Sequence, residues 1–282
     1  MINEKLFEKG EIMSKENKCI IVETTTSGVA TITLNRPEIH NAFDDEFIRE
    51  LTEAIRLINI NDNVRILVID ANGKSFSAGA DLNWMKRMSN YSWEQNYQDS
   101  LKLAGLMQKL HDCKKTTIAI VQGAAFGGGV GLVACCDIVL ASDKAVFCLS
   151  EVKLGLIPSV ISPYVVKAIG ERNSKRYFAT AEKFDANEAK SIQLIHKVYP
   201  CDQLSDQAQD YINRVLANGP KAMYESKRLI NHVYNQPITE ELVLDTAQRI
   251  ADIRASVEGK EGVSAFLEKR PANWSVSIKS DI

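Results

Sequence analysis

The sequence lacks the features by which several large classes of protein are recognised. Positive charge is not in excess, because 34 Lys and Arg residues stand against 36 Asp and Glu residues for a formal net charge of −2. The dense basic face that binds a phosphate backbone is missing, and we expect no nucleic-acid partner. No apolar run approaches membrane-spanning length, and residues 1–18 have no apolar stretch of the kind found in a secretory signal. We expect a cytoplasmic protein that does not bind a membrane.

The 6 cysteines and 4 histidines are too scattered to suggest a metal or redox site. No Cys-x-x-Cys pair and no His-x-x-x-His pair occurs, so the usual spacings of zinc sites and thiol redox centres are absent. Cys135 and Cys136 lie within an apolar run, where reduced core thiols are the ordinary interpretation. We expect no metal ion.

The first part of the chain alternates short β-rich patterns with helical ones. Residues 19–23 and 29–35 alternate in polarity around a Ser-Gly turn signal, which predicts a hairpin. Residues 64–70 and 117–121 are largely apolar, as in strands buried on both faces of a sheet. Tight loops and helices with an apolar face follow these strands, a succession typical of a layered α/β domain.

Helical patterns dominate after residue 160, and Pro220 and Pro237 separate successive helices. No change of composition marks a separate domain. We expect three regions: a disordered tail at residues 1–18, an α/β core at residues 19–200, and a helical region at residues 201–282.

Two loops rich in glycine and alanine are candidates for binding negative charge. Residues 122–131, QGAAFGGGVG, lie between a predicted strand and a predicted helix, where glycine exposes backbone N–H groups and a helix N-terminus favours an anion. Residues 76–82, FSAGADL, have the same arrangement, with Asp81 as a helix cap. Together the loops suggest the two convergent N–H donors that an oxyanion requires. Close helix packing and a simple capped turn are the alternatives for each loop taken alone.

The first of these loops matches none of the common glycine-rich motifs. It lacks the Gly-Lys-Ser/Thr ending of a Walker A loop, the Gly-x-Gly-x-x-Gly of a dinucleotide-binding turn, and the Gly-x-Ser-x-Gly of a nucleophile elbow. A third segment, LSEVKLGLIP at residues 149–158, places Glu151 directly after a β-rich stretch. A single glutamate is usually a surface charge, so Glu151 is a candidate only in combination with the two loops.

The order of the three segments resembles the crotonase, or enoyl-CoA hydratase/isomerase, family. FSAGADL, GAAFGGGVGL with ACCDI, and LSEVKLGLIP follow one another, and EGVSAFLEKRPANW resembles the closing helix of the family, so that the similarity extends over residues 20–274. The resemblance implies an α/β fold, a crotonase-like spiral of ββα units with a C-terminal helical region, assembled as a homotrimer or hexamer. It also implies an acyl-CoA substrate, with CoA as part of the substrate and no separate cofactor.

The resemblance implies a role for each residue that matches the motifs. The backbone N–H groups of Ala80 and Gly128 correspond to the two donors of an oxyanion hole, and Glu151 corresponds to the second of two catalytic glutamates. The residues that correspond to the substrate site are Arg36 and Ala42 near the nucleotide end, Asp81, Leu82 and Asn83 along the CoA moiety, Ala80 and Gly128 at the thioester, and Phe266 and Lys269 in a C-terminal pair that closes the CoA site.

One position departs from the two-glutamate pattern. The first glutamate of hydratases lies three residues after the middle glycine, and Gly131 stands there. Because glycine has no side chain, we expect space for a branched acyl group beside the reacting double bond. SAGADLNWMKRM, ACCDI, LGLIPSVISPYVVKAIGER and RYFATAEKFDANEA resemble bacterial 3-methylglutaconyl-CoA and isohexenylglutaconyl-CoA hydratases, which share this glycine.

We therefore predict a hydro-lyase, an enoyl-CoA hydratase that adds water across the α,β-double bond of 3-methylglutaconyl-CoA or a related branched thioester in leucine or isoprenoid breakdown. Glu151 would act as general acid and base. Two alternatives remain open. A Δ3-Δ2-enoyl-CoA isomerase needs only one carboxylate, and a non-catalytic acyl-CoA-binding or RNA-binding protein needs none.

Overall fold

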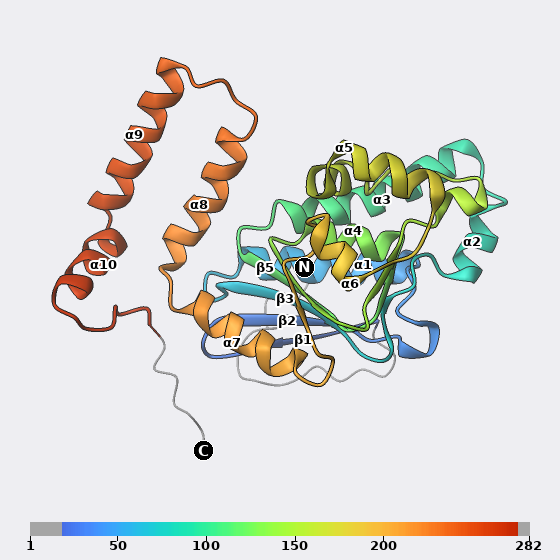
Figure 1. Cartoon of the computed structure of the whole chain (residues 1–282), viewed down its shortest axis with the longest axis horizontal. Coiled ribbons are helices and arrows are strands. Elements are labelled where there is room, and N and C mark those ends of the chain that lie inside the picture. The colour runs from blue at the N-terminus through green and yellow to red at the C-terminus, as the bar shows by residue number, and fades with distance from the viewer. Residues whose placement is uncertain (1–18, 276–282) are drawn as a thin grey trace, which may run out of the picture.

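The computed structural model describes residues 19–275 of the 282-residue chain. The expected N-terminal tail at residues 1–18 lies outside the described residues, as do residues 276–282. Within the described part, two sheets and the helices around them form an α/β core, and three C-terminal helices extend away from it (Figure 1). No helix of that part is long and apolar enough to cross a membrane.

The larger sheet has six strands in the order β1-β2-β3-β5-β7-β10. The predicted hairpin is present, with Ile20 opposite Leu34 in an antiparallel pair, and the other neighbouring pairs are parallel. The strands are β1 (Ile20–Thr24), β2 (Val29–Leu34), β3 (Ile66–Ala71), β5 (Thr116–Val121), β7 (Ile138–Ser142) and β10 (Lys197–Tyr199).

A second sheet takes one short strand from each turn of the chain. After β3, β5 and β7, the chain enters β4, β6 and β8, which pair in parallel, and β9 completes the order β4-β6-β8-β9. Helical segments then return the chain to the larger sheet, so the structure confirms the spiral of ββα units. The short strands are β4 (Ser75–Ser77), β6 (Ala124–Phe126), β8 (Val146–Cys148) and β9 (Phe184–Asp185).

Two of these short strands lie where the sequence predicts only loops. β4 overlaps the start of segment 76–82, and β6 lies within segment 122–131. A strand of three residues is too short to show an alternating pattern. Its existence depends on hydrogen bonds to neighbours that are distant in the sequence, so pattern analysis alone misses it.

The helices of the core begin at polar caps. Asp44 accepts the N–H of Phe47 at the start of α1, and Ser92 forms a capping box with Gln95 at the start of α3. The helices are α1 (Asp45–Ile60), α2 (Leu82–Met88), α3 (Trp93–His111), α4 (Gly128–Cys135), α5 (Ser162–Thr180), α6 (Ala186–Ser191), α7 (Leu204–Leu216), α8 (Pro220–Val233), α9 (Glu240–Ala255) and α10 (Val257–Leu267), with short 3-10 helices η1 (Pro37–Ile39) and η2 (Glu151–Leu154).

Strand β3 is apolar because both faces of the larger sheet are covered. Ile66 and Val68 pack in one cluster with side chains of α7, whereas Leu67 and Ile69 belong to the main core with α1 and α3. All four side chains are buried. Alternate residues of a strand point to opposite faces. The helices on each face therefore cover a different set of apolar side chains and exclude water from them.

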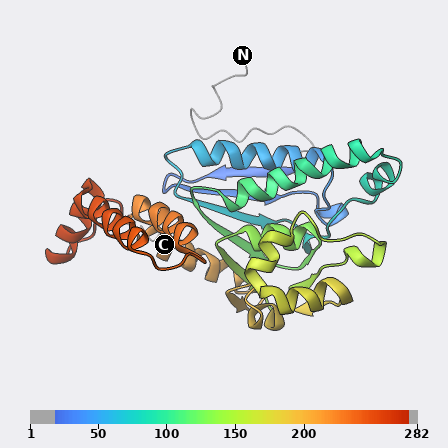
Figure 2. The same cartoon turned by 90° about the horizontal axis from the view of Figure 1, so that it is seen from above.

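Helices α8, α9 and α10 form a C-terminal arm that projects from the core (Figures 1 and 2). α8 and α9 contain no buried residue, and α10 contains one, Ala265. At the base of the arm, Lys227 of α8 pairs with Asp137 at 2.8 Å. Glu258 of α10 accepts the N–H groups of Lys221 and Ala222 at 2.9 and 2.7 Å. These polar contacts hold the base of the arm and the start of α8 in place.

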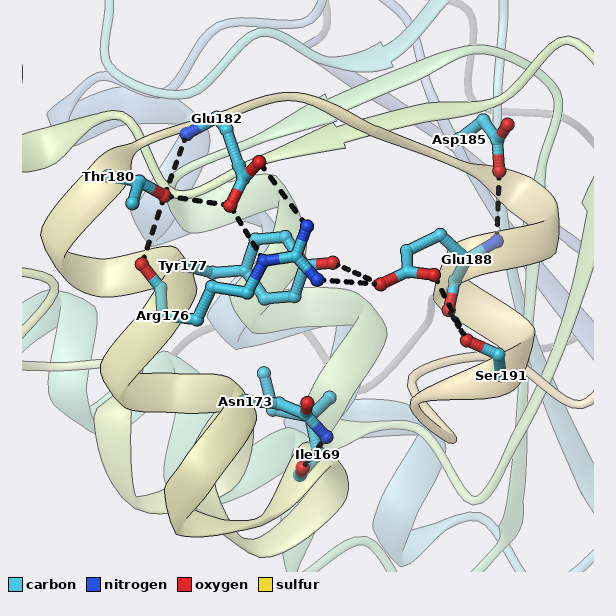
Figure 3. A network of polar contacts seen from close by, with 9 residues as sticks. All are labelled: Ile169, Asn173, Arg176, Tyr177, Thr180, Glu182, Asp185, Glu188 and Ser191. Carbon is cyan, nitrogen blue, oxygen red and sulfur yellow. Dashed lines mark hydrogen bonds and ion pairs between the residues drawn. The ribbon is translucent and has the colours of Figure 1, made fainter.

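A polar network joins the end of α5 to α6 (Figure 3). The buried Tyr177 donates its hydroxyl hydrogen to Oε1 of Glu188 at 2.6 Å. Arg176 pairs with Glu182 at 2.8 Å and with Glu188 at 3.1 Å, and Ser191 also donates to Glu188. The hydrogen bond from Tyr177 is the main cause that holds the pKa of Glu188 below its ordinary value.

Tyr177→Phe should lower the melting temperature by a few degrees, because Glu188 loses its shortest hydrogen bond while the ring remains packed. The lowered pKa means that ionised Glu188 contributes stability above its unfolded-state pKa, and that this contribution is lost as the pH falls through the folded-state pKa. Thermal unfolding between about pH 3 and pH 7 should therefore show a difference that shrinks on acidification. Tyr97→Phe, at a half-exposed position on α3, is the control. A difference that is independent of pH would contradict the role of the carboxylate.

Candidate active site

The three residues with predicted catalytic roles follow three neighbouring strands. Ala80 lies three residues after β4, Gly128 two residues after β6, and Glu151 three residues after β8. β4, β6 and β8 are parallel and adjacent in the second sheet. The carboxyl ends of parallel strands meet at one edge of a sheet, which is where α/β proteins bind ligands. The sheet therefore brings the three residues to a common edge.

Ala80 is held in place by the backbone of Phe43. The N–H of Phe43 donates to the carbonyl of Gly79 at 2.7 Å, and the N–H of Asp81 donates to the carbonyl of Phe43 at 2.8 Å. These two bonds, on either side of Ala80, pair it with Phe43 in an isolated parallel bridge. Within residues 19–275, the N–H of Ala80 itself donates to no protein acceptor. Ala80 is exposed, so its N–H is a donor at the surface of the site.

Gly128 is the first residue of α4. The preceding Gly127 has φ +49°, in the region that favours glycine, and its N–H donates to the carbonyl of Cys148 at 2.9 Å. This bond ties the start of α4 to the end of β8. The N–H at the first position of a helix has no acceptor within the helix and lies at the positive end of the helix dipole. Gly128 is thus placed to donate to an anionic oxygen.

Glu151 lies beside the start of α4. Its Oε1 is 3.2 Å from the place that a Cβ atom on Gly127 would take. Its Oε2 is buried and has no hydrogen-bond partner in the described part of the chain. Burial raises the pKa of Glu151 above its ordinary value, because desolvation disfavours the charged form. A carboxyl group with a raised pKa beside the N-terminus of a helix is suited to proton transfer.

The residues expected along CoA are placed in several ways. Arg36 pairs with Asp44 at 2.7 Å, and Ala42 is buried beneath the same loop. The carboxylate of Asp81 accepts the N–H groups of Asn83 and Trp84 and caps α2. Leu82 and Asn83 are exposed on the first turn of α2, directly after Ala80. The structure therefore brings residues 80–83 together at one surface, while the side chains of Arg36 and Asp81 are engaged within the protein.

The predicted C-terminal pair is not brought to this surface within one chain. Phe266 is 82% exposed on α10, and Lys269 follows the same helix. α10 and α2 lie at opposite ends of the molecule in both views (Figures 1 and 2). In this arrangement Phe266 and Lys269 do not approach residues 80–83 of the same chain.

The expectation of free space at Gly131 is wrong. A Cβ atom on Gly131 would lie 2.3 Å from Cγ2 of Ile161 and 3.1 Å from Cε of Met107. Both neighbours are buried, so apolar side chains already fill the volume beside the glycine. The position at which the two-glutamate pattern carries its first carboxylate is closed to any side chain unless Ile161 moves.

Two further residues near the site escaped the sequence analysis. Asn41 is fully buried with φ +53°, and its side-chain NH₂ donates to the carbonyls of Asn72 and Ser75, both at 2.9 Å. Phe43 is 1% exposed and stacks on Phe47 with ring centroids 4.8 Å apart. An apolar residue directly before a helix cap is the signal that could have identified Phe43, because such residues pack onto the first turn.

A model of the family described as enoyl-CoA hydratase/isomerase matches residues 24–277. The chain belongs to this family. A crotonyl-CoA hydratase of Syntrophomonas wolfei is 32% identical over 264 residues, which are 93% of this chain and 99% of that protein. A mitochondrial enoyl-CoA hydratase of Pongo abelii is 32% identical over 247 residues, 87% of this chain and 83% of that protein.

Solved structures agree with this assignment to the enoyl-CoA hydratase/isomerase family. An enoyl-CoA hydratase from Shewanella pealeana has a TM-score of 0.87 at 46% identity, with 91% of this chain and 96% of that chain covered. The crotonase fold and the enzyme class predicted from the sequence, a hydro-lyase, are confirmed. Among the residues that the structure describes, no three His, Cys, Asp or Glu side chains are grouped so as to hold a metal ion.

Gly131→Ala should destabilise the protein by about 1–3 kcal/mol, the usual cost of overpacking a filled core. Ile161→Ala in the same chain should relieve part of that cost, so the two changes should be non-additive in a double-mutant cycle measured by urea unfolding. Gly105→Ala is the matched control, because no atom lies within 4 Å of its added Cβ in α3. The control should gain roughly 0.5–1 kcal/mol from helix propensity. Equal stabilisation of both variants would show that Gly131 has room after all.

Proposed function

We propose that the chain is an enoyl-CoA hydratase in which Ala80 and Gly128 bind the thioester oxygen and Glu151 transfers the protons. The supporting observation is that two residues with N–H groups free of protein acceptors and one partly buried glutamate follow the ends of the adjacent strands β4, β6 and β8 in the described chain. A catalytic role accounts for the placement of Glu151, whose Oε2 is buried without a hydrogen-bond partner in the described chain. CoA is part of the substrate in this proposal, and no other cofactor takes part.

The reaction follows from this placement. Water adds at C3 of the α,β-double bond, and negative charge develops on the thioester oxygen as C2 becomes the carbanion carbon of an enolate. The N–H groups of Ala80 and Gly128 stabilise that charge, and one such donor is typically worth about 2.7–4 kcal/mol. Glu151 takes the proton that the attacking water loses and returns a proton to C2. Burial raises the pKa of the Glu151 carboxyl group, so it accepts a proton more readily than an ordinary glutamate does.

The proposed substrate is 3-methylglutaconyl-CoA or a related branched enoyl-CoA thioester of leucine or isoprenoid breakdown. The support is the resemblance of the segments around residues 77–88 and 154–190 to hydratases of that group. The volume beside Gly131 is filled, so free space at this position does not support a branched acyl chain. A straight substrate such as crotonyl-CoA, named for the Syntrophomonas wolfei relative, is the direct competitor.

Double-bond isomerisation is the second candidate, favoured by the surroundings of Gly131. Ile161 and Met107 place apolar groups where a second carboxylate would lie. A proton shuttle between C2 and C4 needs one carboxyl group and no water, and apolar surroundings favour such chemistry. Hydration with a single glutamate requires the same residue to activate water and to protonate carbon.

The proposed assembly is a homotrimer or hexamer. The C-terminal arm exposes large apolar side chains that a stable surface in water rarely presents together, Ile238, Val257, Phe266 and Leu267 among them. Burial of the arm against another copy would remove them from water. It would also allow Phe266 and Lys269 to approach residues 80–83 of a neighbouring chain.

A panel of three thioesters distinguishes the candidates. We expect hydration of 3-methylglutaconyl-CoA with a higher kcat/KM than crotonyl-CoA, and no product from a 3-enoyl-CoA. Ultraviolet loss of the conjugated thioester and chromatography of the products measure both reactions. A clear preference for crotonyl-CoA would remove the branched substrate but keep the hydratase. Conversion of the 3-enoyl-CoA alone would establish the isomerase, and no turnover at all would leave a binding protein.

Glu151→Gln should lower kcat by about two to four orders of magnitude, the scale typical of acid–base residues. The same variant should be more stable than wild type above the ordinary carboxyl pKa, because the raised folded-state pKa means that stability is lost as the pH rises through it. Urea unfolding at a series of pH values measures this difference, which should vanish in acid. Glu241→Gln, exposed on α9, is the control for both measurements. Retention of near wild-type kcat would exclude Glu151 from the chemistry.

A further inference from the structure

One short segment, residues 40–43, runs beside the loop that carries Ala80. The N–H of Ala78 donates to the carbonyl of His40 at 2.9 Å, and Oγ of Ser77 donates to the carbonyl of Asn41 at 2.8 Å. The two backbone bonds of Phe43 then bracket Ala80. The segment thus fixes the position of the Ala80 N–H through the backbone.

The side chain of Phe43 extends from this segment to the other donor. A Cβ atom on Gly128 would lie 2.9 Å from Cε2 and 3.1 Å from Cδ2 of Phe43, so the ring is in direct contact with the first turn of α4. The ring is buried and stacks on Phe47 of α1 at 4.8 Å. The next residue, Asp44, caps α1 and pairs with Arg36. Phe43 therefore packs against α1, and the cap and ion pair of Asp44 fix the start of that helix.

This double contact matters because both donors lie beyond the ends of their strands. Hydrogen bonds between β4 and β6 end at Ser77 and Ala125, before Ala80 and Gly128 are reached. The separation of the two N–H groups therefore depends on contacts beyond the ladder. The two loops approach each other where Gly79 lies against Phe126, and Phe43 adds a contact to each loop. Phe43 joins the two, with its backbone on one loop and its ring on the other.

We infer that Phe43 is a positioning residue that sets the spacing of the Ala80 and Gly128 N–H groups. The inference rests on the proposed function, because it concerns the oxyanion hole of that reaction. Catalytic hydrogen-bond donors act through preorganisation, so a small displacement of one donor costs transition-state stabilisation more than ground-state binding. Shortening the ring should free Gly128 while the backbone bonds to Gly79 and Asp81 remain.

The experiment compares wild type, Phe43→Leu and Phe43→Ala in the full-length protein with crotonyl-CoA or the better substrate of the panel. We expect kcat to fall at least about tenfold in Phe43→Leu and further in Phe43→Ala, since loss of one oxyanion donor typically costs about 10²–10³. KM should change by less than about threefold, because CoA contacts are untouched. Hexadienoyl-CoA serves as a chromophoric probe: its absorption should shift to the red on binding wild type, and less so on binding the variants.

Phe184→Leu is the matched control. Phe184 lies in β9 and is also apolar and buried, but it packs on Phe147 and Tyr177 and not on the candidate site. It should lose stability and keep both kcat per folded molecule and the red shift. Wild-type kcat and an unchanged red shift in folded Phe43→Ala would overturn the inference. Absence of turnover and of a red shift in wild type would instead overturn the proposed function itself, so the two failures are distinguishable.

Discussion

Hydrogen bonding between three short parallel strands, β4, β6 and β8, is the constraint on which the candidate site depends. Each strand has only three residues, and each lies in a different turn of the chain. Their pairing brings Ala80, Gly128 and Glu151, which span 71 positions of sequence, to one edge of a sheet. The larger sheet and its covering helices supply the buried apolar area that makes such short ladders stable.

Close packing around the candidate site limits which residues can replace its glycines. Gly128 faces the ring of Phe43, and Gly131 faces Ile161, at distances that exclude a Cβ atom. Both glycines are needed for packing, because the absence of a side chain lets the backbone of α4 approach its neighbours closely. The N–H of Gly131 is used within α4, where it donates to the carbonyl of Gly127 at 3.2 Å. A second carboxylate at position 131 is incompatible with this packing, so Glu151 is the one candidate carboxyl group of the two-glutamate pattern that the described chain retains.

The surroundings of Glu151 cost stability and favour the proton transfer that we propose for it. Its Oε2 is buried and lacks a protein partner in the described chain, an arrangement that costs stability when the group is ionised. The Glu188 carboxylate, by contrast, is satisfied by Tyr177, Arg176 and Ser191 and keeps a lowered pKa. The two pKa shifts are opposite because hydrogen-bond donors stabilise the charged form of Glu188, whereas desolvation disfavours the charged form of Glu151.

The sequence by itself determined the local elements and the identity of the candidate groups. The hairpin, the apolar strand β3, the cap at Asp81 and the spiral fold all follow from patterns within a few residues or from motif order. Tertiary structure alone decided three features: the strands β4 and β6, the filled volume at Gly131, and the contact of Phe43 with Gly128. Each involves residues more than 20 positions apart. Such contacts leave no periodic trace in the chain, because a residue's distant neighbours are set only when the sheets and helices pack together.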